Sequence, residues 1–397
     1  MKGLIIRNGL ELNSSWAKRV IHWRLSFNEN IFNTKIISAY PNKPVEFING
    51  TEGIYYLLGI KLPQLVVYFI SPFLLLKYLI REKPDFVLLA NGGFFEFYTI
   101  PIYCRLAKIP LLVDMVDTIG RMYKTNKSII DYLIIWNKKL YDRYIVRYSN
   151  EVFVISTDLE MKYKKLYPHK KISKSVPSTV DVKQFEEVSK LEIKFLGNSI
   201  YDLFNDRETI KIFYAGTITR LNGIEFFFKA FSEIISGIDL KIKIIFAIIQ
   251  GDVDKLIDLS CKYKLENHIV IVPSVPQKYL PILLCKADIL FIPEQGTEIA
   301  NAGFPGKTSE YLLSGIPIIT TNFSDLGNYL INEINSCISN LGDIISYKTN
   351  LNRLIIEPQF RNEIGLNGKK LAIELFSHQN CSLPFISSVN SFYKTNN

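Results

Sequence analysis

The chain has 397 residues, 48% of them hydrophobic, a length that predicts two domains with separate cores. Lysine and arginine outnumber aspartate and glutamate by 47 to 38, and the net charge of +9 favours an anionic partner such as a nucleotide, a nucleic acid or an anionic membrane. No run reaches the five or six like charges typical of a nucleic-acid tail, so we expect no nucleic-acid partner. A basic surface without a special partner is an equal alternative.

The cysteines and histidines are scattered. None of the five cysteines forms a CxxC pair, and the four histidines have no metal-ligand spacing, so we expect neither a disulfide frame nor a metal site. The first residues, MKGLIIRNGL, lack the long apolar core of a signal peptide. These features predict a cytoplasmic protein.

Short apolar runs alternate with stretches of helical length along the whole chain, which is typical of βαβ units and parallel sheets. The first half contains GLIIR, TKIISAY, DFVLLAN, PLLVDMV and EVFVIS, and the second contains IKIFYAG, KIKIIFAII, NHIVIVP, ADILFIP and IPIITT. A polar, irregular stretch separates the two series. The pattern therefore predicts two doubly wound α/β domains that meet near residues 180 to 206.

The segment LPQLVVYFISPFLLLKYLI, from Leu62 to Ile80, approaches the length of a membrane-spanning helix. Pro63, Pro72 and Lys77 interrupt it, and a charged turn and a short buried strand follow at once. We favour a helix of the domain core. A helix that also touches a membrane surface and a spanning helix remain as alternatives.

Ligands of open parallel sheets lie beyond the carboxyl ends of the strands, so the residues after each run are candidates. In the first half these residues are candidates for contacts with a sugar-like ligand, although turn formation and helix capping explain them equally well. The candidates are Asn8, Gly9, Gly92, Gly93 and Asp114. Asn91 and Asp117 are the catalytic candidates.

In the second half, the stretch GFPGKTSEYLLSGIPIITT starts at Gly303 and contains half of a nucleotide-triphosphate loop, Gly306-Lys307-Thr308. Asn301 stands where such a loop needs its first glycine, so we do not expect an NTPase. Earlier, Gly216 ends a predicted strand and a helix opens near Asn222, an arrangement suited to phosphate.

The pair Asp252 and Asp254 matches a DxD motif, which can hold a metal ion on a nucleotide. The alternative, which we favour, is that Asp252 caps the N-terminus of the following helix.

Two stretches together, IFYAGTITRLNGIEFFFKAF and ADILFIPEQGTEIANAGFPGKTSEYLLSGIPIITT, resemble the donor-binding domain of GT-B glycosyltransferases, particularly the family-four retaining enzymes (glycosyl transferases group 1). The resemblance covers most of residues 150 to 380. It implies an α/β GT-B fold of two Rossmann-like domains that face a central cleft. The implied parts are an acceptor domain (1–180), a linker (181–206), a donor domain (207–375) and a C-terminal helix (376–397) that packs back on the acceptor domain.

The resemblance also implies a donor site, in which Glu310 matches the glutamate that binds the nucleotide ribose. A carboxylate suits this role because it can accept hydrogen bonds from both ribose hydroxyls. The donor-binding candidates are Gly216, Thr217, Arg220, Asn222, Gly303, Phe304, Pro305, Gly306, Lys307, Thr308 and Glu310.

The chain departs from the family pattern in several places. Ala302, Thr217 and Asn222 replace an acid and a cationic pair of many relatives, and Val116 replaces a histidine before Asp117. We expect Lys307 and Arg220 to supply the missing positive charge.

By resemblance, the chain is expected to transfer a sugar from a nucleotide-diphosphate sugar to a hydroxyl of a glycan or a polyprenyl-linked saccharide. The family implies retention of anomeric configuration, no essential metal and no cofactor other than the donor. We expect a role in bacterial surface polysaccharide synthesis, with peripheral docking at the inner face of the plasma membrane as a further hypothesis. The alternative is a catalytically silent GT-B scaffold or a glycan-binding protein.

Overall fold

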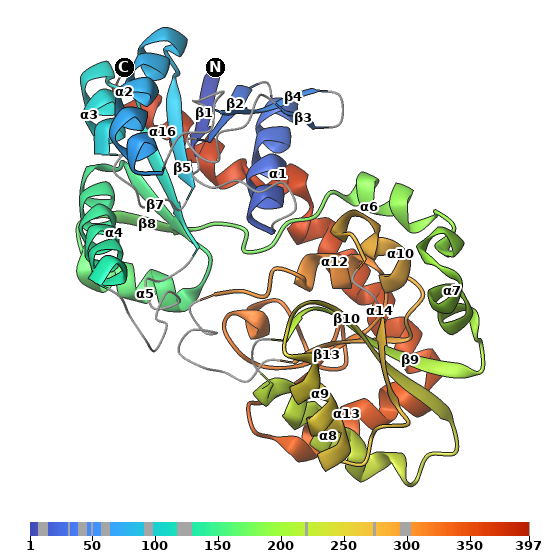
Figure 1. Cartoon of the computed structure of the whole chain (residues 1–397). Helices are drawn as coiled ribbons and strands as arrows, with labels where there is room; N and C mark the ends of the chain where they lie inside the picture. The colour runs from blue at the N-terminus through green and yellow to red at the C-terminus, as the bar shows by residue number, and fades with distance from the viewer. Residues whose placement is uncertain are drawn as a thin grey trace. The chain divides into compact units, whose positions relative to one another are not determined.

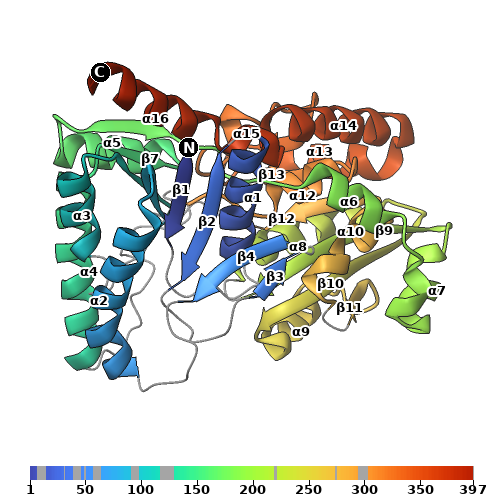
Figure 2. The same cartoon turned by 90° about the horizontal axis from the view of Figure 1, so that it is seen from above.

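The computed structural model describes residues 1–6, 15–30, 32–38, 46–48, 51–56, 64–90, 98–116, 129–218, 221–272, 275–293 and 303–396. The chain divides into two compact units, which we call unit 1 (Met1–Thr179 with His378–Asn397) and unit 2 (Val180–Ser377). Each unit consists of a largely or wholly parallel sheet with helices packed against it (Figures 1 and 2). The predicted α/β class with two doubly wound units is thereby confirmed.

Unit 1 is built on an eight-stranded sheet in the order β3-β4-β2-β1-β5-β6-β7-β8, in which only the pair β3 and β4 is antiparallel among the described pairs. Its strands are β1 (Lys2–Ile6), β2 (Asn33–Ser38), β3 (Glu46–Ile48), β4 (Thr51–Tyr56), β5 (Phe86–Ala90), β6 (Leu111–Met115), β7 (Glu151–Val154) and β8 (Lys171–Lys174). Its helices are α1 (Ser15–Glu29), α2 (Gln64–Glu82), α3 (Thr99–Ala107), α4 (Ile129–Tyr148), α5 (Thr157–Leu166), α15 (His378–Cys381) and α16 (Leu383–Asn396).

Both faces of the unit 1 sheet are covered, which explains why its central strands are continuous apolar runs. All five residues of β5 are buried. On one face, Phe86 and Leu88 pack in a cluster with Trp23 and Phe27 of α1 and with Phe385 of α16. The last helix of the chain thus completes the core of the first unit.

Unit 2 is built on a six-stranded parallel sheet in the order β11-β10-β9-β12-β13-β14. Its strands are β9 (Thr209–Ile218), β10 (Lys241–Gly251), β11 (Ile269–Val272), β12 (Ile289–Ile292), β13 (Ile318–Thr321) and β14 (Cys337–Ser339). Its longer helices are α6 (Val182–Ser189), α7 (Asn198–Asn205), α8 (Asn222–Ile235), α9 (Val253–Lys262), α13 (Ile344–Ile356) and α14 (Pro358–Leu371). Its shorter ones are η3 (Ile193–Leu196), η4 (Gln277–Tyr279), α10 (Leu280–Leu284), α12 (Thr308–Leu313), η5 (Leu326–Asn328) and the π-helical η6 (Ala372–Phe376).

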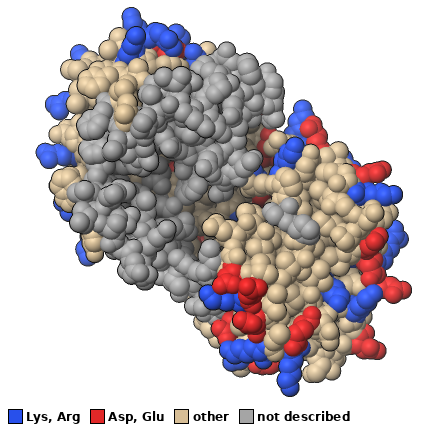
Figure 3. All heavy atoms as spheres, viewed as in Figure 1, with Lys and Arg blue, Asp and Glu red and all other residues tan. Residues whose placement is uncertain are grey.

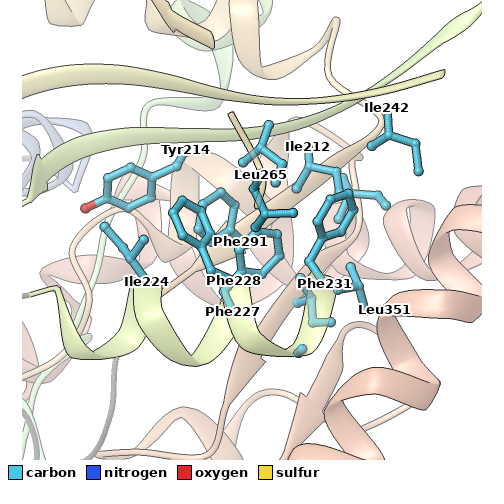
Figure 4. Packing of buried hydrophobic residues seen from close by; sticks show 14 of the residues in the cluster. Ile212, Tyr214, Ile224, Phe227, Phe228, Phe231, Ile242, Leu265, Phe291 and Leu351 are labelled. Atoms are coloured by element: carbon cyan, nitrogen blue, oxygen red, sulfur yellow. The ribbon is translucent and has the colours of Figure 1, made fainter. Parts of the chain in front are cut away.

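Aromatic side chains of α8 fill the core of unit 2 (Figure 4). Phe227 stacks on Phe291 of β12 with ring centroids 4.3 Å apart, and Phe231 stacks on Phe227 at 6.1 Å. The helix begins at Asn222, near the position predicted from the strand-glycine-helix pattern. This packing holds α8 against β12 of the sheet.

Residues 181–206 differ from the expected linker, because they form α6, η3 and α7 and belong to unit 2. The division into units falls at Thr179 and again after Ser377, so the chain passes between the units twice. Residues 378–397 belong to unit 1.

The apolar segment from Leu62 to Ile80 lies largely in α2, which continues through Pro72. Ser71, Leu75 and Leu79 are buried, as in a core helix, whereas Phe73 is 75% exposed. Within the described residues, no helix is long and apolar enough to cross a membrane. The structure thus supports the core-helix interpretation of this segment and leaves an exposed apolar side on it.

The charges of unit 2 do not gather into one patch on the face that Figure 3 shows, where acidic and basic side chains are interspersed. The net positive charge of the chain is therefore no guide to a ligand on this face.

Candidate functional site

The loop that leads into α12 is fixed by hydrogen bonds from its own residues and from a neighbouring turn. The hydroxyl and the backbone N–H of Thr308 both donate to the carbonyl oxygen of Pro305, at 2.8 and 3.0 Å. The Ser324 hydroxyl donates to the carbonyl oxygen of Gly303. Because the Thr308 hydroxyl is buried and engaged in this turn, it is not placed as the magnesium ligand of a nucleotide-triphosphate loop.

Phe304 packs under the same loop against aromatic side chains of unit 2. Its side chain is buried, and its ring lies 5.7 Å from that of Tyr329 and 6.2 Å from that of Phe376. These contacts give Phe304 a packing role at the base of the loop. The adjacent Gly306 is exposed, and an added Cβ there would meet no atom within 4 Å.

Lys307 reaches from the start of α12 to the carboxyl end of β9. Its Nζ donates to the carbonyl oxygen of Ala215 at 3.1 Å and lies 3.9 Å from the centroid of the Tyr214 ring. Both contacts fix the position of the ammonium group. The cation is thereby held at the end of β9 although it comes from a segment 92 residues further along the chain.

Gly216 is required by this arrangement. A Cβ at this position would lie 2.6 Å from the Nζ of Lys307, and the backbone φ of +150° is one that residues with side chains rarely adopt. The next residue, Thr217, is exposed, and the pairing of β9 with β10 shifts register opposite these two residues. The strand pairing is thus irregular near the end of β9, where the lysine lies.

Tyr311 makes a second link between α12 and β9, which the sequence analysis missed. Its hydroxyl is fully buried and accepts a hydrogen bond from the backbone N–H of Ala215 at 2.9 Å. Burial raises the pKa of Tyr311 well above its usual range. Lys307 and Tyr311 are four residues apart, so they lie on one face of the helix. This spacing is the feature of the sequence that could have indicated that Tyr311 contacts β9 together with Lys307.

Glu310 lies in the first turn of α12 and is half-buried. Its negative charge is one of the factors that raise the pKa of the neighbouring Tyr311, after burial. The structure therefore places the ammonium group of Lys307 at the end of β9 and the carboxylate of Glu310 in the first turn of α12, three residues further along the chain. Such a pair can bind a phosphate and a vicinal diol, the two polar parts of a nucleotide.

Asp114 lies in β6 and is fully buried. Its carboxylate pairs with the guanidinium of Arg19 at 3.1 Å and accepts a hydrogen bond from the Ser175 hydroxyl at 2.7 Å. Arg19 is itself buried and also donates to the carbonyl oxygen of Val176. This network gives Asp114 a structural role that the sequence did not reveal. Contact of Asp114 with the acceptor stays a prediction.

Several predicted site residues lie outside the described part of the chain, namely Asn8, Gly9, Asn91, Gly92, Gly93, Asp117 and Arg220. The side chain of Asn222 is not described either, although its backbone begins α8.

Asp252 caps α9 as the favoured interpretation predicted. Its side chain accepts a hydrogen bond from the backbone N–H of Lys255 at 3.2 Å and pairs with the ammonium of the same residue at 3.0 Å. Among the residues that the structure describes, no three histidine, cysteine, aspartate or glutamate side chains are grouped as metal ligands.

Comparison with known proteins finds a match to a family model for part of the chain and a shared fold for nearly all of it. Residues 201–371 match the family model described as Glycosyl transferases group 1. No curated protein matches the sequence.

Among solved structures, a glycosyltransferase from Rickettsia africae superposes with a TM-score of 0.72 at 14% identity and covers 99% of this chain and 98% of its own. Sucrose-phosphate synthase from Thermosynechococcus elongatus gives 0.68 at 12% identity, with 99% of each chain covered. The Anabaena protein HepE, solved with UDP and glucose, gives 0.69 at 12% identity and covers 98% of this chain and 100% of its own.

Proposed function

We propose that the protein transfers a sugar from a nucleotide-diphosphate sugar, because residues 201–371 match the family model of the glycosyl transferases group 1 and the chain shares its fold with solved glycosyltransferases. The proposed acceptor is a hydroxyl of a glycan or of a polyprenyl-linked saccharide in bacterial surface polysaccharide synthesis. The reaction is proposed to retain the anomeric configuration and to need no metal. The similarity to HepE, whose structure contains UDP and glucose, supports a donor of this class.

The observation that carries the proposal is that the Nζ of Lys307, which immediately precedes α12, lies at the end of β9, while Glu310 lies in the first turn of α12. In the proposed complex the ammonium of Lys307 stabilises the negative charge that grows on the leaving diphosphate, because a fixed cation needs no reorganisation during the reaction. Glu310 accepts hydrogen bonds from the ribose hydroxyls. The departing phosphate takes the acceptor proton, so no strong side-chain base is required.

The variant Glu310→Gln tests the donor site, because it keeps the shape of the side chain and removes its charge. Charge-assisted hydrogen bonds contribute about 1.5 to 3 kcal/mol, so affinity for the preferred nucleoside diphosphate should fall about tenfold or more. A thermal-shift screen across nucleoside diphosphates first identifies that ligand. Isothermal titration calorimetry then measures the dissociation constant.

The matched control is Glu266→Gln, a change at an exposed glutamate before β11. It should leave both the affinity and the melting temperature unchanged. Equal affinity in Glu310→Gln and the wild type would remove Glu310 from the site.

Slow hydrolysis of the donor in the absence of acceptor distinguishes an enzyme from a silent scaffold. We expect the protein to release the nucleoside diphosphate faster than the donor hydrolyses alone, and we expect EDTA to leave this rate unchanged. A chain that binds the nucleotide without turnover would favour the scaffold, and a loss in EDTA would bring Asp252 and Asp254 back as metal ligands.

Unit 1 is proposed to dock on the inner face of an anionic membrane, where a lipid-linked acceptor is presented. Besides Phe73, the exposed apolar side chains of α2 include Ile70 and Ile80, and those of α4 include Tyr132 and Trp136. Aromatic and aliphatic side chains of this kind bind at the headgroup level, and basic residues add attraction to anionic lipids.

Vesicle flotation measures this docking. Binding to anionic vesicles should decrease with added salt, and the double variant Phe73→Ser with Ile80→Ser should release the protein without a change in melting temperature. The control Ile345→Ser removes an equally exposed apolar side chain of unit 2 and should float like the wild type. If the wild type ignores anionic vesicles at low salt, the acceptor is a soluble saccharide and the docking proposal fails.

A further inference from the structure

A cavity of about 710 Å³ lies at the edge of the unit 1 sheet where β7 and β8 begin. The last turn of α5 and the loop that leads into β8 form one wall, and the last two turns of α4 form another. Its lining residues are Arg143, Arg147, Leu166, Tyr167, Pro168, His169 and Lys170. In this type of sheet the substrate site lies at the opposite edge, beyond the carboxyl ends of the strands.

Basic side chains dominate the lining, and no carboxylate contributes to it among the side chains that the structure describes. Arg143 and Arg147 are one turn apart on α4, so they project from the same face of the helix. The ammonium of Lys170 is held in place by the carbonyl oxygens of Arg147 and Ser149, at 3.1 and 2.6 Å. Partial burial lowers the pKa of Lys170.

Helix termini explain part of this cluster but not all of it. The C-terminal end of α4 carries a partial negative charge, which accounts for Lys170 and for Arg147 in the last turn. Arg143 lies more than one turn before the end of α4, beyond the reach of that effect. Within the described residues, the side chains of Arg143 and His169 have no hydrogen bond or ion pair, so their donors remain available to a ligand.

We propose that this cavity binds a phosphate-bearing anion. Its volume is within the range of small-molecule sites. Two guanidinium groups one turn apart offer planar pairs of donors that match phosphate oxygens, and the ammonium and imidazole groups add further donors. Leu166, 59% exposed, and Pro168 give the cavity an apolar wall that suits the carbon part of such a ligand.

The phosphate can belong to a soluble phosphate ester or to the headgroup of an anionic lipid, which present the same chemistry. Either source would occupy unit 1 independently of the donor site in unit 2. The proposal therefore does not rest on the sugar transfer, and loss of this site should leave donor hydrolysis unchanged.

A histidine signal gives a local readout of binding. The chain has only four histidines, so ¹³C-labelled histidine yields few resonances, and the variant His169→Gln assigns the one in the cavity. Titration of the wild type with pyrophosphate should shift the His169 resonance in a saturable manner. In the double variant Arg143→Gln with Arg147→Gln, the apparent affinity should fall about tenfold or more, because two charge-assisted contacts are lost.

The matched control is Lys162→Gln with Lys165→Gln, which removes two exposed positive charges of α5 that do not line the cavity. This control should bind pyrophosphate like the wild type. Flotation with phosphatidylcholine vesicles, with and without phosphatidylglycerol, completes the test.

A saturable shift with pyrophosphate that weakens in the arginine variant supports a phosphate site in the cavity, whichever source supplies the phosphate. Flotation then separates the sources: a loss of binding to phosphatidylglycerol vesicles in the arginine variant, but not in the lysine control, identifies a lipid headgroup, and equal flotation of the two identifies a soluble phosphate ester. If the His169 resonance does not respond to pyrophosphate and the arginine variant floats like the control, the cavity is no phosphate site and the proposal is overturned.

Discussion

The contact between Gly216 and Lys307 is the most specific feature of the proposed donor site at the scale of single residues. Lys307→Ala should weaken binding of a nucleoside diphosphate about tenfold or more and leave binding of the nucleoside nearly unchanged, because only the phosphates interact with the ammonium. Gly216→Ala should have a similar effect, since its Cβ would displace the Lys307 Nζ. Calorimetric titration with both ligands measures the difference.

Lys278→Ala is a suitable control for this pair. Lys278 also lies over a tyrosine ring, that of Tyr279, at 4.6 Å, but in η4 rather than at the end of β9. It should leave both affinities unchanged. If Lys307→Ala weakens nucleoside and nucleoside diphosphate equally, the lysine supports the fold and does not contact the phosphates.

His22 makes the stability of unit 1 depend on pH. Burial, together with the nearby His378, Lys18 and Arg19, lowers the pKa of His22 from 6.5 to about 3. Between these values the unfolded chain binds a proton that the folded chain does not, so the free energy of unfolding rises with pH. Acidification from pH 6.5 to pH 5 should therefore cost about 2 kcal/mol.

Chemical denaturation at a series of pH values measures this dependence. His22→Gln keeps a group that can hydrogen-bond to the Thr179 hydroxyl but cannot bind a proton, so the slope below pH 6.5 should decrease. The control His169→Gln replaces an exposed histidine and should retain the slope of the wild type. An unchanged slope in His22→Gln would mean that this imidazole is not the group responsible.

Among the elements, α14 packs so closely on the turn after α12 that no side chain fits between them. A Cβ on Gly365 would lie 2.0 Å from the carbonyl oxygen of Gly315. Gly365→Ala should therefore lower the stability of unit 2 by about 1 to 3 kcal/mol, as overpacked cores do. Gly237→Ala, whose Cβ would meet only an ordinary contact at 3.7 Å, should be tolerated, and thermal unfolding compares the two.

The buried strands of both sheets could be predicted from the sequence because their apolar runs are continuous. The strand β8, with the sequence KISK, was missed because it is short, lies at the edge of the sheet and buries only Ile172. The region from α6 to α7 was interpreted as a linker for a similar reason. Helix α6 has only eight residues and buries only Phe185, so its apolar spacing is too short to stand out from a polar linker.

The candidate site was only partly predictable. Local motifs indicated Glu310, Lys307 and Gly216, because each lies in a recognisable loop. The contacts that fix them join distant segments, as when Tyr311 binds the backbone of Ala215 across 96 residues. The pairing of Asp114 with Arg19, 95 residues apart, is of the same kind, and no spacing rule along the chain reveals it.

At the scale of the whole molecule, residues that follow unit 2 in the chain complete the core of unit 1. Phe385 is fully buried, and its ring lies 4.3 Å from that of Phe153 and 5.2 Å from that of Trp23. Phe385→Ala should destabilise unit 1 by about 3 to 5 kcal/mol, the usual cost of such a cavity. Hydrogen exchange followed by mass spectrometry should show lost protection in β1, β5 and β7 while β9 and β10 keep theirs.

This discontinuity has a consequence for biosynthesis. The ribosome makes the first 179 residues of unit 1, then all of unit 2, and only afterwards the helix that contains Phe385. At a synthesis rate of about 5 to 20 residues per second, unit 2 occupies the ribosome for roughly 10 to 40 seconds. During that interval Trp23 and Phe27 lack the side chain of Phe385 that packs on them, and chaperones that bind apolar surface can compete with aggregation of the nascent chain. Unit 2, although second in order of synthesis, is thus the first to be able to complete its core.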